Sequence, residues 1–170
     1  MSLKLDKYKT HGEYYRVDIC RENDNNICID EADCGLFLSL FDKFLINNSS
    51  ISLLAYCLNE NFCSLLLIQK EKNGIEKFLH NLTIAYNNYY FDKYKISDLL
   101  FENNYKIAMV SIEEILEVSR SIHKIPENWK DCQNSSIRAY LYDDKPDWID
   151  KTHIVSLNGS AKEYFKYMSD

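Results

Sequence analysis

The chain contains 13 tyrosines, six cysteines and four histidines, the side chains that most often serve as nucleophiles, metal ligands and general bases. The histidines, His11, His80, His123 and His153, lie in separate segments, and none has metal-ligand spacing to a neighbour. The cysteines form no CxxC pair. These spacings argue against a zinc site, and the thiols are expected to be reduced and mostly structural.

A serine or cysteine nucleophile would need a base on the same face of its element. Ser121 is followed by His123, but residues two apart on a helix point to different faces. Cys63 lies between Phe62 and Ser64 in an apolar run and is expected to face the other side of a sheet from both. Neither Ser121 nor Cys63 is therefore expected to act as a nucleophile.

Hydrophobic periodicity predicts the elements that would position these side chains. Residues 13–20 alternate, with Tyr15 and Val17 on one face and Arg16 and Asp18 on the other, as a half-buried strand does. Later segments show either the same alternation or apolar residues at helical spacing. The expected elements are a strand at 13–20, a helix from a cap at Asp30 to about 45, a central antiparallel hairpin of strands 51–58 and 62–68, a helix at 75–91 after Gly74, a strand at 105–110, and a helix from a capping box at Ser111 and Glu114 to about 121.

The resulting βαββαβα order favours an α+β fold, an RRM-like or ferredoxin-like antiparallel sheet with helices packed on it. Residues 1–170 are expected to form a single domain with a core at about 12–126. The C-terminal extension, about 127–170, shows short helical patterns at 136–142 and 161–168 and is expected to wrap around the core as a tail.

Composition and charge limit the function classes. A hydrophobic content of 46% in 170 residues is enough for a packed core, so a disordered regulator is disfavoured. The net charge of −6 disfavours tight sequence-independent binding to a polyanion. Because no apolar stretch is long enough to cross a membrane and the N-terminus has no apolar signal core, the expected location is the cytoplasm.

Five segments, in order along the chain, carry a resemblance to one protein family. Residues 55–67, AYCLNENFCSLLL, are similar to the AYCLMPNHxHLLL signature of the REP-associated tyrosine transposases, which belong to the single-strand HUH transposases. The other four segments are 105–107 (YKI, similar to GRYKA), 119–126 (SRSIHKIP, similar to xRYIHLNP), 135–141 (SSIRAYL, similar to SSYRAYL) and 146–150 (PDWID, similar to PDWLD). The resemblance extends over nearly the whole chain and implies an RRM-like sheet with flanking helices.

The resemblance also implies a site that has lost its chemistry. In that family, two histidines of an HxH strand and a polar residue on a later helix hold Mg²⁺ or Mn²⁺, and a tyrosine on that helix attacks the phosphate. The two histidine positions correspond to Phe62 and Ser64, the third ligand to Ile125 and the tyrosine to Ser121. None of these side chains replaces the function of the family residue, so no cofactor, no metal ligand and no catalytic residue is expected.

A nucleic-acid surface is a separate expectation. The family's basic stretch corresponds to 88–98 here, where lysines are interrupted by Asp92 and Asp98. Tyrosine rings can stack on unpaired bases and lysines can contact phosphates, a combination typical of single-strand binding. The alternative for this segment is a solvated face over a packed aromatic core. The candidate DNA-binding residues are Tyr90, Lys93, Tyr94, Lys95 and Lys106.

Three hypotheses follow from these residues. The first is a transposase-like protein that binds single-stranded or hairpin DNA without cleaving it. The second is a protein-interaction or structural domain on the same scaffold, and the third is an enzyme that uses other residues. A homodimer or another protein partner stays open at this stage, and the fold alone does not choose between the hypotheses.

Overall fold

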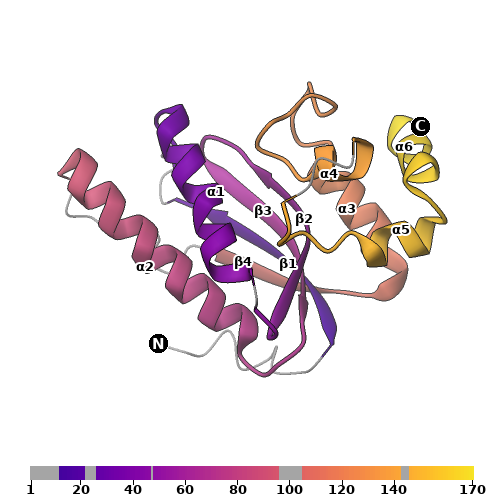
Figure 1. Cartoon of the computed structure of the whole chain (residues 1–170), viewed down its shortest axis with the longest axis horizontal. Coiled ribbons are helices and arrows are strands. Elements are labelled where there is room, and N and C mark those ends of the chain that lie inside the picture. The colour runs from indigo at the N-terminus through magenta and orange to yellow at the C-terminus, as the bar shows by residue number, and fades with distance from the viewer. Residues whose placement is uncertain (1–11, 22–25, 47, 96–104, 143–145) are drawn as a thin grey trace.

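A four-stranded antiparallel sheet forms the centre of the molecule (Figure 1). The computed structural model describes residues 12–21, 26–46, 48–95, 105–142 and 146–170. The sheet order is β2-β3-β1-β4, and each neighbouring pair is antiparallel. The predicted order of elements is confirmed as far as the helix after the last strand. The strands are β1 (Glu13–Cys20), β2 (Ile51–Leu58), β3 (Phe62–Gln69) and β4 (Tyr105–Val110).

The hairpin of β2 and β3 is present, but its predicted central position is wrong for one of its strands. β3 is interior because β1 pairs along its other side, whereas β2 is at the edge of the sheet. β2 is nevertheless almost completely buried, because the C-terminal residues cover its outer edge. Isolated bridges join Leu53 to Ile149 and Cys57 to Ser135 along this edge. A covered edge resists pairing with another chain.

Two long helices, α1 (Glu31–Leu45) and α2 (Gly74–Tyr94), pack together on one face of the sheet (Figure 1). α1 begins as predicted at Asp30, in a capping box with Asp33. Its buried Phe37 and Phe41 contact ring systems of α2 and β2, with 4.9 Å between the ring centroids of Phe37 and Tyr86. α2 begins at Gly74, where a Cβ atom would lie 2.7 Å from the carbonyl oxygen of Ser50. A residue without a side chain is needed at that approach.

The remaining helices lie on the other side of the sheet (Figure 1). The predicted capping box of Ser111 and Glu114 begins a short 3₁₀ turn that leads into the next α-helix, which contacts β2 and β3. The predicted C-terminal helices are present, but α5 was not expected, since it buries only Ile154 and shows no apolar stripe. These elements are η3 (Ile112–Glu114), α3 (Ile115–His123), α4 (Ile137–Leu141), α5 (Thr152–Asn158) and α6 (Ala161–Ser169).

The C-terminal residues are integrated into the core. The Tyr140 hydroxyl donates a 2.6 Å hydrogen bond to the Leu54 carbonyl in β2, and Trp148 packs on the Phe41 and Tyr56 rings. Ile154, Tyr164 and Met168 are completely buried. Within the described part of the chain, no helix has the length and apolar character needed to cross a bilayer.

Candidate nucleic-acid interface

The strand register puts polar side chains on the sheet face opposite α1 and α2. Asp18 is in register with Ser64 of β3 on one side and with Lys106 of β4 on the other. Arg16 is in register with Ala108 of β4. α3 covers the β2 and β3 part of this face, whereas Lys106 and Ala108 are exposed. We call the exposed area around Arg16, Asp18, Lys106 and Ala108 the open sheet face.

A chain of hydrogen bonds joins this face to α3. The Ser64 hydroxyl donates to Asp18 Oδ1 at 2.5 Å, and Arg16 Nε donates to both oxygens of Asp18 at 3.2 and 3.1 Å. Arg16 Nη1 then donates to Ser121 Oγ at 3.2 Å. The Arg16 and Asp18 side chains keep 32% and 27% of their surface exposed. The chain Ser64, Asp18, Arg16 and Ser121, which we call the polar network, therefore reaches solvent.

The positions that resemble the metal ligands do not fit a divalent ion. Phe62 and Ile125 have no donor atom, and the buried Ser64 hydroxyl is directed at Asp18. Asp18 is the carboxylate of the network, and the Arg16 guanidinium already neutralises it. Mg²⁺ requires several oxygen ligands in octahedral geometry. In the described residues, no group of three or more His, Cys, Asp or Glu side chains is placed to hold a metal ion.

In the described part of the chain, the partners of Ser121 do not include a general base. Its hydroxyl donates to the Val118 carbonyl at 2.7 Å and accepts from Arg16. His123 is completely buried on another side of α3, as predicted from the spacing of the two residues. Its Nδ1 lies 2.8 Å from the Tyr164 hydroxyl and its Nε2 lies 2.7 Å from Ser136 Oγ. Burial lowers the pKa of His123 to about 3, so the imidazole is neutral and structural.

The predicted DNA-binding residues at the end of α2 take part in contacts within the protein. Lys93 Nζ is 2.7 Å from a carboxylate oxygen of Asp30 and 2.7 Å from one of Asp33. The Tyr94 hydroxyl donates to Asp33 at 2.7 Å, and Tyr89 does so at 2.8 Å. Burial alone would raise the pKa of Asp33, but these hydrogen bonds hold it at about 2. We call Asp30, Asp33, Tyr89, Lys93 and Tyr94 the Asp33 cluster.

The other candidate residues lie in different surroundings. Tyr90 is only 1% exposed, and its hydroxyl accepts a 3.0 Å hydrogen bond from Arg21. Lys95 caps the C-terminus of α2 in a left-handed conformation and is exposed. Lys106 is exposed on the open sheet face, whereas α2 covers the opposite face. Lys93 and Lys95, at the end of α2, therefore lie on the other side of the sheet from Lys106.

Arg16 and Asp18 were not among the sequence-derived candidates. The alternation of 13–20 had placed them on one face, which was the available signal. Their connection to Ser64 and Ser121 depends on strand register and on the docking of α3. The alternation of residues within one strand does not contain that information.

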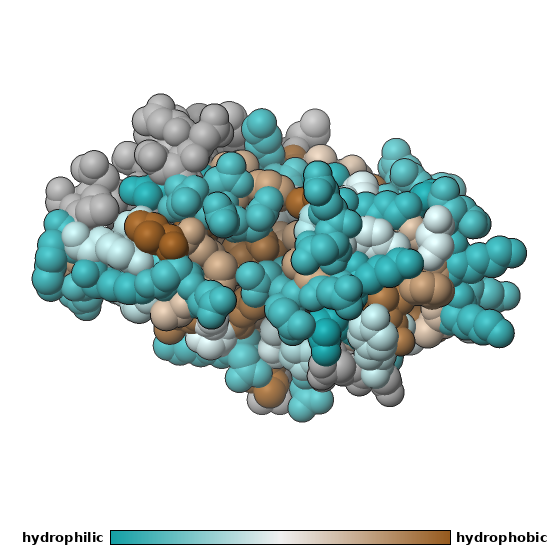
Figure 2. All heavy atoms as spheres, turned by 90° about the horizontal axis from the view of Figure 1, so that it is seen from above, coloured by the Kyte–Doolittle hydropathy of each residue, from teal (hydrophilic) through white to brown (hydrophobic). Residues whose placement is uncertain are grey.

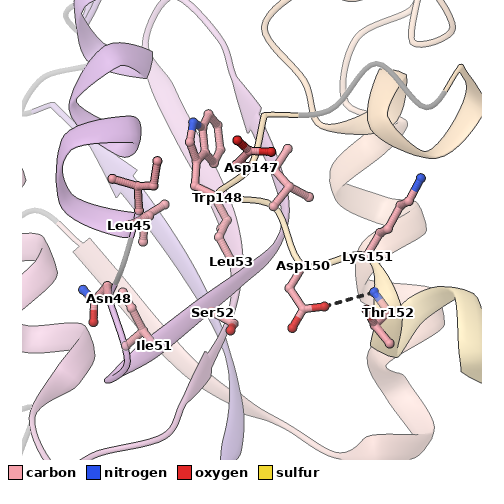
Figure 3. Close-up of a pocket in the computed structure, with 12 residues that line it drawn as sticks. Leu45, Asn48, Ile51, Ser52, Leu53, Asp147, Trp148, Asp150, Lys151 and Thr152 are labelled. Atoms are coloured by element: carbon pink, nitrogen blue, oxygen red, sulfur yellow. Dashed lines mark hydrogen bonds between the residues drawn. The ribbon is translucent and has the colours of Figure 1, made fainter.

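A cavity of about 540 Å³ lies beside the C-terminal end of α1 and the beginning of β2 (Figure 3). Asp150 lines it and accepts a hydrogen bond from the Thr152 amide at 3.1 Å, while Lys151 Nζ donates to the Ala139 carbonyl. Two aspartates in its wall disfavour a phosphate ligand. Its lining residues are Leu45, Ile46, Asn48, Ile51, Ser52, Leu53, Asp147, Trp148, Ile149, Asp150, Lys151 and Thr152.

Hydrophilic side chains dominate the face of the molecule in Figure 2, with smaller groups of apolar side chains between them. Exposed large apolar residues in the described part include Ile84 and Phe91 of α2 and Met109 of β4, with 47%, 50% and 52% of their surface accessible. Ile84 and Phe91 belong to one helix and Met109 belongs to a strand, and a few exposed apolar residues are normal on a protein surface.

The fold is similar to that of solved proteins that act on nucleic acids or nucleotides. A REP-associated tyrosine transposase bound to a REP hairpin aligns with a TM-score of 0.63 at 10% identity, over 85% of this chain and 90% of that chain. A bacterial tRNA(His) guanylyltransferase-like protein in complex with GTP aligns with a TM-score of 0.50 at 12% identity, over 84% of this chain and 75% of that chain.

No protein-family model and no curated protein matches the sequence. The alignment of the structures nevertheless shows that the chain has an α+β, transposase-like fold. At this level of identity the likeness concerns the fold alone, and the two structural neighbours differ in activity.

Proposed function

We propose that this chain is a cytoplasmic, single-domain, transposase-like protein that binds single-stranded or hairpin DNA on its open sheet face and does not cleave it. The observation that carries the proposal is that Arg16 and Lys106 lie on the exposed part of an antiparallel sheet in a transposase-like fold. The order β2-β3-β1-β4 is also the one expected for a ferredoxin-like or RRM-like sheet.

The open sheet face offers contacts suited to a single strand. The Arg16 guanidinium has donors beyond those used on Asp18 and Ser121, and it can bind a phosphate through two of them. Lys106 adds a second cation beside it, and Phe62 and Tyr14 on the same face are half-buried rings on which bases can stack. Asp18 offsets part of this charge, so the expected affinity is modest.

The α2 end is a second, weaker contact in this proposal. Lys95 is exposed, so its ammonium group can contact a phosphate. Lys93 and Tyr94 would have to leave Asp33 first, and the Tyr90 ring would have to leave the core. We therefore assign the main contacts to Lys106 and Arg16, with Lys95 next.

Absence of cleavage is part of the proposal. Among the residues that the structure describes, none that could act as a base is hydrogen-bonded to Ser121, and Phe62, Ser64 and Ile125 do not supply metal ligands. A phosphate bound by Arg16 would lie near the Ser121 hydroxyl without a group to remove its proton. Binding without Mg²⁺ dependence is the expected behaviour.

The test is fluorescence anisotropy of labelled single-stranded DNA hairpins at low salt, with and without Mg²⁺. Lys106→Glu should weaken binding at least tenfold, because it places a carboxylate on the open sheet face. Lys162→Glu, on the exposed side of α6, makes the same change in net charge and should alter binding less than twofold. Equal losses in the two variants would place binding elsewhere, and no binding by the wild type would overturn the proposal.

A protein-interaction or structural domain is the second candidate. It is favoured by the net charge of −6 and by the Asp33 cluster, which holds Lys93 and Tyr94 away from a ligand. A homodimer or another protein would then be the partner. This function predicts no DNA binding even at low salt, so the anisotropy measurement separates the two candidates.

A further inference from the structure

Two pairs of cysteine thiols are in hydrogen-bond contact although their members are distant in sequence or separated by a turn. The Cys57 thiol, in β2, donates to the sulfur of Cys132, in the segment before α4. Cys28 and Cys34, at the start of α1, form the second pair. None of the six cysteines, all of which lie in the described residues, forms a disulfide in this structure. A pair of thiols in contact needs little movement to form a disulfide.

The backbone holds the first pair together. The Leu58 amide donates to the Asn134 carbonyl at 2.8 Å, and Cys57 forms an antiparallel bridge with Ser135. The Ser136 amide donates to the Tyr56 carbonyl at 3.0 Å. These bonds run on both sides of Cys57, so the segment that carries Cys132 has a fixed position against β2. The contact between the thiols therefore follows from the way the C-terminal residues cover the edge of the sheet.

The two pairs differ in reactivity. The hydrogen bond from Cys57, helped by the Asn134 amide, lowers the pKa of the Cys132 thiol to about 6, whereas the same hydrogen bond, together with burial, raises the pKa of Cys57. Burial raises the pKa of Cys28 and of Cys34. Nearby Asp33, Glu60 and Asp30 raise the pKa of Cys34 further. Cys132 is also only half-buried. A thiolate that solvent can reach is the form that oxidants attack.

We propose that Cys132 and Cys57 form a redox-responsive disulfide that fastens the segment before α4 to the edge strand β2. A peroxide first transfers one oxygen to the Cys132 thiolate, which gives a sulfenic acid and releases hydroxide. The Cys57 thiol then attacks that sulfur, forms the S–S bond, and loses its proton as water leaves. The sum is two thiols and one hydrogen peroxide giving one disulfide and two waters.

The disulfide would act on the part of the fold that holds the C-terminal residues in place. The same segment carries Ser136, whose hydroxyl bonds to His123 and to the Tyr56 backbone. Closing a loop from 57 to 132 restricts the unfolded chain strongly. The expected result is a rise in Tm of about 10 °C on oxidation, reversed by a thiol reductant.

The experiment exposes the reduced, full-length protein to a small molar excess of hydrogen peroxide. Intact mass should fall by about two mass units, as expected for loss of two hydrogens. Peptide mapping without reduction should recover a 57–132 crosslink. Cys132→Ser should abolish the mass change and the rise in Tm, and Cys34→Ser, the half-buried member of the other pair, should leave them unchanged.

Cys132 is the safer position to replace, because it is partly exposed and its substitution leaves β2 intact. The proposal would be overturned if Cys132 gained oxygen while Cys57 still reacted with an alkylating agent, because no disulfide would then have formed. It would also be overturned if a disulfide between Cys28 and Cys34 formed first. A 57–132 crosslink without any reversible change in Tm would refute the fastening role. Neither the mass change nor the change in Tm depends on DNA binding, so these outcomes are independent of the proposed function.

Discussion

Ser64, Asp18, Arg16 and Ser121 form a continuous hydrogen-bonded chain where the resemblance predicts metal ligands and a tyrosine nucleophile. The polar side chains at these positions therefore bind one another within the protein. A histidine placed at 64 or a tyrosine placed at 121 would have to displace these partners.

The triple variant Phe62→His, Ser64→His and Ser121→Tyr is expected to remain inactive in DNA cleavage. The side chain at 64 is buried, so a histidine there meets Asp18 and Arg16, whose guanidinium disfavours a nearby cation. Ile125 also still lacks a ligand atom. Incubation of labelled single-stranded hairpins with Mn²⁺ and the variant checks this, and robust nicking would show that the network does not block the site.

His123 makes stability depend on pH. Its pKa is about 3 in the folded protein against an ordinary value of 6.5, because burial disfavours the charged imidazole. The unfolded chain therefore binds a proton that the folded chain does not, and stability is full above pH 6.5 and falls as the pH decreases towards 3. Between pH 7.5 and pH 5 this residue should cost about 2 kcal/mol of unfolding free energy.

Urea denaturation at the two pH values measures the effect. His123→Gln should lower stability at pH 7.5, since Tyr164 and Ser136 lose a well-placed partner, and should also flatten the dependence on pH. His80→Gln, on the exposed side of α2, should behave as the wild type. An unchanged pH slope in His123→Gln would mean that another group is responsible.

At the scale of elements, sequence periodicity predicted the helices and strands whose own residues carry an apolar pattern. The strand of Tyr15 and Val17, the helix cap at Asp30 and the capping box at Ser111 could be placed because their signals are local. α5 was missed because a single buried residue, Ile154, leaves no periodicity to detect. The edge position of β2 was missed because its cover comes from residues far along the chain.

The same distinction applies to the candidate site. Phe62, Ser64, Ser121 and Ile125 could be named from motifs, but the polar network needed the register of β1 against β3 and the position of α3. The Asp33 cluster also joins residues from two helices. A lysine or tyrosine in a sequence shows what it can bind, and its neighbours in space decide what it does bind.

The Asp33 cluster should stabilise the packing of α1 on α2. Asp33 is completely buried and accepts hydrogen bonds from Lys93, Tyr89 and Tyr94. Asp33→Asn removes the charge and leaves donors facing an amide, so we expect a loss of about 2 kcal/mol in unfolding free energy. Asp42→Asn, exposed on the same helix, should change stability by less than about 0.5 kcal/mol in the same urea titration.

The Asn substitution also tests how the α2 end relates to DNA binding. If release of Lys93 and Tyr94 allows them to contact DNA, Asp33→Asn should bind hairpins more tightly than Asp42→Asn, which makes the same change in net charge. If the main contacts are on the open sheet face, the two variants should have similar affinities. We expect similar affinities, and a clear gain in Asp33→Asn would move the interface to α2.

For the whole molecule, the net charge of −6 sets the form of any DNA binding. A protein with this charge cannot rely on its overall field, so affinity has to come from the few cations that face the strand. With Arg16, Lys106 and Lys95 as phosphate contacts, and about 0.7 counterions released per contact on a single strand, the slope of log affinity against log salt should be about −2. Affinity should therefore fall about tenfold to twentyfold between 50 and 200 mM salt.

Hairpin titrations over this range measure the slope of log affinity against log salt, and Lys106→Glu should make that slope shallower. A slope near −5 would require a larger basic surface than the described residues provide, and a slope near zero would indicate that base stacking, rather than phosphate contact, dominates the interaction.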